Sequence, residues 1–191
     1  MKTSIAPFAS LDEDLAPLSV RPAVTDADRR AAATVLRQAY QPHASPVPAA
    51  ALVIHLTELF DLRERMPGGV MLLARWRGRV VGAAICHPQP GRRPGLWPRR
   101  WMSVRALAVA PEARRWGVGQ KLLLACAVHA REHGASALCL HVADFMTPGH
   151  AFAHGRGLAR MRLFDVVLGE DEGFEPGKGV VLLAYVMAVA D

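Results

Sequence analysis

The chain has 191 residues, enough for one domain with a buried core, and 51% of them are hydrophobic. This share and a moderate 21% of charged residues exclude a disordered chain, and the longest apolar run, 180–190, is too short to span a bilayer. The formal net charge of +6 favours an anionic partner.

The cysteines and the N-terminus indicate the cellular compartment. Cys86, Cys126 and Cys139 are odd in number, form no Cys-x-x-Cys pair and lie in apolar stretches, so buried thiols are expected rather than disulfides or metal ligands. Acidic residues at 12–14 interrupt any apolar run that a signal peptide would need. The sequence therefore predicts a cytoplasmic protein without a membrane partner.

The first part of the chain divides into a tail and the start of a domain. Residues 1–17 show no periodic pattern and are expected to form a tail or arm before a single domain over 18–191. Apolar spacing and turn residues predict these elements: a strand over 18–22, a helix capped by Thr25, a helix over 49–65, and a hairpin of strands over 70–76 and 80–86.

The second half alternates strands and helices. The expected elements are strands over 101–109, 137–142, 160–168 and 180–189, a long helix over 117–133 and a short helix over 148–156. The strand, helix and strand in the middle predict a right-handed parallel unit.

The turn before the long helix has the character of a phosphate site. Gly117 and Gly119 leave backbone N–H groups uncovered at the positive end of the helix dipole, and Arg114 and Arg115 add charge. The Gly-Lys-Ser/Thr of an ATP-binding loop and the three-glycine spacing of a dinucleotide fold are both missing. The turn therefore predicts a phosphate or pyrophosphate site of another kind.

The full motif resembles the acetyl-coenzyme A motif of the GNAT N-acetyltransferases. It reads Val109-x-Pro111-x-x-Arg114-x-x-Gly117-x-Gly119-x-x-Leu122. The order of the expected elements from about 18 to 189 resembles the same family. The resemblance implies an α/β (α+β) fold with a mixed central sheet of about seven strands flanked by about four helices. It also implies transfer of an acetyl group from acetyl-coenzyme A to a primary amine of a small molecule or protein by direct attack.

The resemblance also implies which residues hold the coenzyme. The backbones of Leu107 and Val109 would bind the pantetheine amides, and the N–H near Val109 would polarise the thioester carbonyl. The pyrophosphate would lie on the loop and helix start, which comprise Arg114, Arg115, Trp116, Gly117, Val118, Gly119 and Gln120. No resident metal is expected.

The sequence departs from the family where a catalytic acid is usual. Family members often carry an asparagine and a tyrosine after the fifth strand, and aligning Phe152 and Gly157 places Met146 and Ala153 at those positions. Neither side chain donates a hydrogen bond. The alternative function is therefore a catalytically weakened acyl-coenzyme A-binding module with a sensing or interaction role.

Other polar residues are candidates for proton transfer. Asp144 follows the fifth strand and is expected to act as base or to orient an amine, with a helix cap as the alternative. His141 faces either the cleft or the core, and His87 ends the third strand. Tyr185 is expected in the core.

The remaining basic and histidine residues are interpreted as surface groups. His129/His133 and His150/His154 have the i, i+4 spacing of a helical metal site, but without a third ligand nearby they are expected on helix surfaces. Arginines cluster in a loop at positions 92, 93, 99 and 100, and no nucleic-acid partner is expected there because no helix is available to enter a groove. A homodimer is left open.

Overall fold

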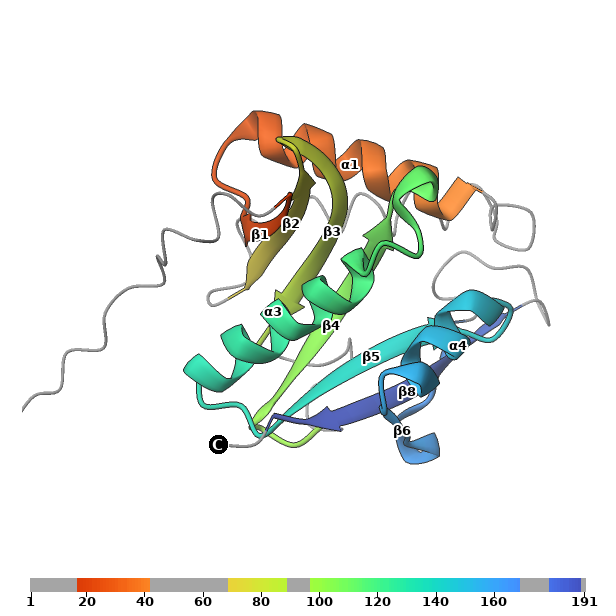
Figure 1. Cartoon of the computed structure of the whole chain (residues 1–191). Helices are drawn as coiled ribbons and strands as arrows, with labels where there is room; N and C mark the ends of the chain where they lie inside the picture. Colours follow the sequence, from red (N-terminus) through yellow and green to blue (C-terminus); the bar gives the residue numbers. More distant parts are fainter. Residues whose placement is uncertain (1–16, 42–68, 89–96, 169–178, 190–191) are drawn as a thin grey trace, which may run out of the picture.

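The computed structural model describes residues 17–41, 69–88, 97–168 and 179–189. One eight-stranded sheet runs through it in the order β1-β2-β3-β4-β5-β8-β6, with β7 also paired to β8 (Figure 1). Neighbouring strands are antiparallel in every pair except β4 and β5, which are parallel. The mixed sheet confirms the fold class expected from the sequence.

The strands are β1 (Leu18–Pro22), β2 (Val70–Trp76), β3 (Arg79–His87), β4 (Trp101–Val109), β5 (Ala137–Ala143), β6 (Ala159–Arg160), β7 (Val166–Leu168) and β8 (Val180–Ala188). The helices are α1 (Asp26–Tyr40), α3 (Val118–Glu132) and α4 (Thr147–Gly155), with single 3₁₀ turns at Pro111–Ala113 and Arg162–Phe164. The expected helix over 49–65 and the expected tail lie outside the described residues.

One sequence prediction is wrong: the single strand over 160–168 is divided into β6, a 3₁₀ turn and β7. The carboxylate of Asp165 explains the break. It accepts the backbone N–H of Ala184 at 2.9 Å and pairs with the guanidinium of Arg160, so a side chain takes a place that a continuous strand would fill with backbone. Three short elements thus replace one, and the sheet of the described residues has eight strands, in keeping with the expected number of about seven.

Helices α1 and α3 lie on opposite faces of the sheet. Adjacent residues of a strand point to opposite faces, and Ala83 packs with Ala32 of α1. A Cβ on the preceding Gly82 would lie 2.7 Å from Val118 and 3.0 Å from Leu122 of α3. Gly82 therefore allows the close approach of α3, which lies across the front of the sheet in Figure 1. No helix among the described residues is long and apolar enough to cross a membrane.

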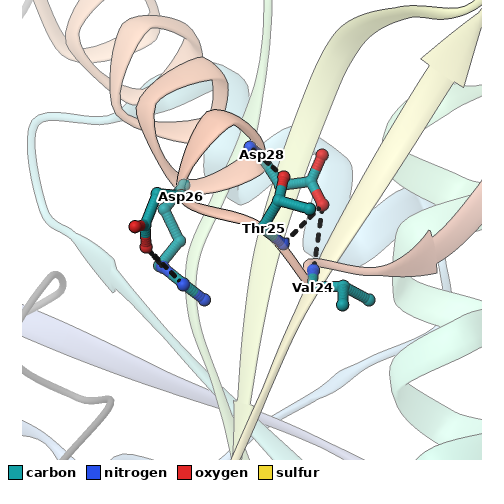
Figure 2. A network of polar contacts seen from close by, with 5 residues as sticks. Val24, Thr25, Asp26 and Asp28 are labelled. Atoms are coloured by element: carbon teal, nitrogen blue, oxygen red, sulfur yellow. Dashed lines mark hydrogen bonds and ion pairs between the residues drawn. The ribbon is translucent and has the colours of Figure 1, made fainter.

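The start of α1 is fixed by a reciprocal cap (Figure 2). The Thr25 hydroxyl accepts the N–H of Asp28 at 3.1 Å, while the Asp28 carboxylate accepts the N–H groups of Thr25 and Val24 at 3.0 and 2.9 Å. These backbone donors lower the pKa of Asp28 to about 2. Because the folded pKa is lower than the unfolded one, this stabilisation is present at neutral pH and is lost as the pH falls from about 4 toward 2.

We expect Thr25→Ala to lower the free energy of unfolding by about 0.5–2 kcal/mol, because an N-cap side chain that satisfies a helix N–H is lost. Chemical denaturation measures the change. Thr34→Ala is the control, since Thr34 lies in the middle of α1 and its hydroxyl donates to the Arg30 carbonyl of its own helix. Equal stability losses in the two variants would contradict the importance of the cap.

Candidate functional site

The β4 and β5 strands separate in the middle of the sheet. They pair in parallel only from Trp101 to Val104 on β4 and from Ala137 to Leu140 on β5, although β4 continues to Val109 and β5 to Ala143. Beyond Leu140, β5 remains paired with β8 alone, and Figure 1 shows the two strands diverging. The opening between them, here called the β4–β5 gap, has backbone on both sides.

A bulge in β4 coincides with this divergence. The register with β3 shifts between the Ala83 and Ile85 pairings, and Ala106 has a positive φ of 52°. Such a bulge bends a strand and redirects its backbone groups. Beyond it, Ala110 donates its N–H to Val81 of β3 at 2.9 Å. Since backbone groups alternate along an extended strand, those of Val109 and Leu107 point away from β3, toward the gap.

The glycine-bearing loop begins α3 at the end of β4. Gly117 is the N-cap residue, with φ of 81°, and its position has no side-chain cap. A side chain at Gly117 would meet open space, so the left-handed backbone is what requires glycine there. Arg114, Arg115 and Trp116 around it are exposed. Positive charge and uncapped helix N–H groups therefore lie beside the end of the gap.

Gly119 has a different role, because it is a point of close packing. A Cβ there would lie 3.2 Å from the ring of Phe152 on α4 and 3.6 Å from the side chain of Val109. The Arg156 guanidinium also bonds the Gln120 side chain. The first turn of α3, the end of β4 and α4 therefore meet beside the gap, and this brings together the motif residues predicted from the sequence.

A tyrosine–histidine pair holds α4 against β8 and β5. His150 Nε2 lies 3.0 Å from the Ala143 carbonyl and 3.2 Å from the Asp144 carbonyl, so it is the donor nitrogen. His150 Nδ1 then accepts the Tyr185 hydroxyl at 2.9 Å. Tyr185 is buried, as expected. The surface position expected for His150 is wrong, because its ring is partly buried and bonded on both sides, whereas His154 is exposed with its ring edge-on to Tyr185.

Met146 and Ala153 occupy positions that cannot supply an acid. Met146 is the N-cap residue of α4 and gives no side-chain cap. Ala153 has no exposed surface and belongs to the main core. Ala153 therefore lies in a packed core.

Asp144 lies just past the end of β5. Its N–H donates to Val181 at 2.9 Å, and its side chain is exposed. The alternative interpretation as a helix cap is excluded, because Met146 holds the cap position and no side chain caps α4. Asp144 thus presents an exposed carboxylate at the open end of the gap.

His141 lies on the other face of the sheet, where its half-buried ring packs against an aromatic cluster. The Trp97 ring is edge-on to His141 with centroids 5.1 Å apart, and Trp97 stacks on Phe164 at 4.5 Å. His141 Nε2 lies 2.9 Å from the Phe164 carbonyl. Desolvation lowers the pKa of His141, and the nearby Arg105 guanidinium lowers it further against the opposing effect of the Phe164 carbonyl. The contact between Trp97 and Phe164 could not be predicted from the sequence, because the two residues are far apart in the chain.

The remaining candidate residues lie outside this site. Cys86, Cys126 and Cys139 are buried free thiols, as predicted. No group of three potential metal ligands occurs among the described residues. The His129 and His133 rings contact each other at the end of α3, with centroids 4.0 Å apart and their planes tilted by 38°. Of the arginine cluster only positions 99 and 100 are described; both are exposed, and Arg100 bonds the Gly134 carbonyl.

We expect Ala153→Tyr to destabilise the fold by about 1–3 kcal/mol, because a ring must enter a packed core. Ala151→Tyr on the exposed side of the same helix is the matched control. Thermal unfolding of both variants measures the difference. An Ala153→Tyr protein as stable as the control would show that the surroundings of Ala153 readily accept a ring.

Residues 34–158 match the sequence model of the acetyltransferase (GNAT) family. No curated protein sequence is significantly similar to the chain. Solved structures share the fold. Ribosomal-protein-alanine N-acetyltransferase from Brucella melitensis has a TM-score of 0.64 at 22% identity, over 88% of this chain and 98% of its own.

Two further structures are similar at lower sequence identity. An N-acetyltransferase from Staphylococcus aureus Mu50 has a TM-score of 0.63 at 15% identity, over 92% of this chain and 100% of its own. YncA from Salmonella typhimurium, with its cofactor acetyl-coenzyme A, has a TM-score of 0.62 at 17% identity, over 92% of this chain and 96% of its own.

Proposed function

The chain belongs to the acetyltransferase (GNAT) family, and we propose that it transfers an acetyl group from acetyl-coenzyme A to a primary amine. The β4–β5 gap is the observation that carries this proposal. Among the described residues, it brings three features along one path: the edges of β4 and β5 that no longer pair with each other, a helix start without a side-chain cap, and exposed arginines. A long ligand with amides at one end and phosphates at the other matches that order of groups.

The coenzyme would lie along this path with its phosphates at the helix. The loop from Arg114 to Gln120 receives the pyrophosphate through backbone N–H groups, the helix dipole and arginine charge. Leu107 and Val109 bond the pantetheine amides along the gap. The Val109 N–H then points at the thioester carbonyl and stabilises the oxyanion that forms when the amine attacks.

Few of the described side chains near the gap can act on the acceptor amine or on the leaving thiolate. Asp144 is exposed at the open end of the gap, and its carboxylate would attract and orient a cationic amine. Met146 and Ala153 cannot protonate the leaving thiolate, so we assign that proton to solvent. Much of the rate would then come from placing the two reactants together.

A second candidate function is a coenzyme-binding module with weakened catalysis. The buried Ala153, in place of the family's tyrosine, favours it. Both candidates bind acetyl-coenzyme A, so turnover rather than binding separates them. For the first, the acceptor is a small-molecule or protein amine in the cytoplasm and not a nucleic acid; a homodimer stays a prediction.

We expect Gly119→Glu to weaken acetyl-coenzyme A binding by at least about tenfold, which is roughly 1.4 kcal/mol. The new carboxylate repels the phosphates, and its Cβ crowds Phe152. Isothermal calorimetry measures the affinity, with Leu124→Glu as control because Leu124 is exposed on the same helix. Equal affinities in parent, variant and control would show that this loop does not bind the phosphates of the coenzyme.

A panel of amines separates the two candidate functions. With acetyl-coenzyme A present, we expect release of free thiol and one acetylated product from at least one class among an alkyl diamine, an aminoglycoside, an amino acid amide and a peptide with a free N-terminus. Thiol detection and mass spectrometry measure both products. Tight coenzyme binding with no thiol release from any amine would favour the binding module.

A further inference from the structure

His141 stands where the two strands part. It is the first residue of β5 beyond Leu140, the last residue paired with β4, and Arg105 holds the corresponding place on β4 after Val104. The positive charge of Arg105 lowers the pKa of His141. The pair therefore flanks the closed end of the β4–β5 gap.

His141 and Arg105 lie on the face of the sheet opposite the glycine-bearing loop that begins α3. Leu140 and Val142 face α4, because a Cβ on Gly149 of that helix would lie 2.7 Å from Val142. His141, between them, points to the other face. Cys86 on β3 pairs with Val104 on β4, which in turn pairs with Leu140 on β5, so the three side chains share one face of the sheet. The Cys86 thiol contacts the Cys126 carbonyl of α3. Helix α3 and the glycine-bearing loop at its start therefore lie on the same face as Leu140. An acceptor reaching the gap from the His141 side would meet the thioester without crossing the coenzyme.

The chemistry of His141 suits a base. A carbonyl oxygen can only accept, so Nε2 carries the hydrogen that bonds Phe164, and the lone pair of the neutral ring is on Nδ1. Among the described residues, the hydrogen-bond contact of Nδ1 is with the Cys139 Sγ at 4.0 Å, longer than a normal hydrogen bond. Burial raises the pKa of that thiol to about 12, so it stays neutral.

The charged groups around His141 come from two directions. Arg105 on β4 and Arg160 on β6 lower its pKa, whereas Asp165, in the connection between β6 and β7, raises it. Burial adds to the lowering and is the largest cause. The ring is therefore neutral near pH 7, in the form that takes up a proton.

The same face also has an unsatisfied donor. Trp97 is buried, and its Nε1–H has no hydrogen-bond partner in the part of the chain that the structure describes. A buried indole N–H without a partner is uncommon. Because the Trp97 ring lies against His141, an acceptor that reaches His141 would bring a polar group near this donor.

We propose that His141 Nδ1 is the base that deprotonates the acceptor ammonium, which enters on this face; this rests on the proposed function. One proton passes from the ammonium to Nδ1, and the amine lone pair forms the N–C bond to the thioester carbonyl carbon. The C–S bond then breaks, its electron pair stays on sulfur, and the second amine proton passes through solvent to the thiolate. His141 finally returns its proton to solvent, so the products are amide, thiol and one proton.

His141→Gln tests the role, since the glutamine amide still donates to the Phe164 carbonyl. With the alkylamine that the parent acetylates best, we expect kcat/KM to fall about 10²–10⁴-fold, with acetyl-coenzyme A affinity unchanged. For the parent, kcat/KM plotted against pH should reach its plateau at a pH below the ordinary histidine pKa of about 6.5. For the variant, kcat/KM should keep rising with pH up to the pKa of the amine itself. His133→Gln, on the exposed end of α3, is the control.

Arg105→Met provides a second test if His141→Gln folds poorly. Removing this charge should raise the pKa of His141 and move the acid limb of the parent profile to higher pH. The assignment would be overturned if the low-pH rise of kcat/KM occurred at the same pH in both variants as in the parent. A loss in kcat/KM of less than about tenfold in His141→Gln would also overturn it. If the parent releases no thiol with any amine, the proposed function fails. If the parent is active but the variants show none of the expected changes in kcat/KM and its pH dependence, only the assignment of His141 as the base fails.

Discussion

The parallel pairing of β4 with β5 ends after four residues on each strand, and the candidate site depends on that ending. Each strand keeps its other neighbour, so the sheet stays intact while two backbone edges separate inside it. The bulge at Ala106 redirects β4 at that place, and α3 begins where β4 ends. Helices α3 and α4 then meet through Gly119 and Phe152 and close one side of the opening.

Most of the fold could be predicted because its signals are local. Thr25 marked the start of a helix, and its cap bonds only span the first turn of α1. The hairpin turn between β2 and β3 is equally local, with Gly78 at a positive φ. The break in the strand over 160–168 could not be predicted in the same way. It depends on Asp165 bonding Ala184, which is nineteen residues away in the chain.

The site was predictable in its backbone part and much less in its side chains. Gly117 needs a left-handed backbone, a requirement that sequence alone can suggest. The partners of His150 and His141 come from other elements, namely Tyr185 on β8 and the Phe164 carbonyl before β7. Periodicity gives a face to each residue but not its neighbour, so the surface interpretation of His150 failed and the face of His141 stayed open.

The central claim is that the β4–β5 gap and the loop after β4 hold acetyl-coenzyme A. Backbone amide chemical shifts measured by NMR, with and without the coenzyme, test it most directly. We expect the largest changes at Leu107, Val109 and residues 117–120, together with slower amide exchange at Val109. Changes confined to other parts of the sheet, or no change at saturating coenzyme, would contradict it.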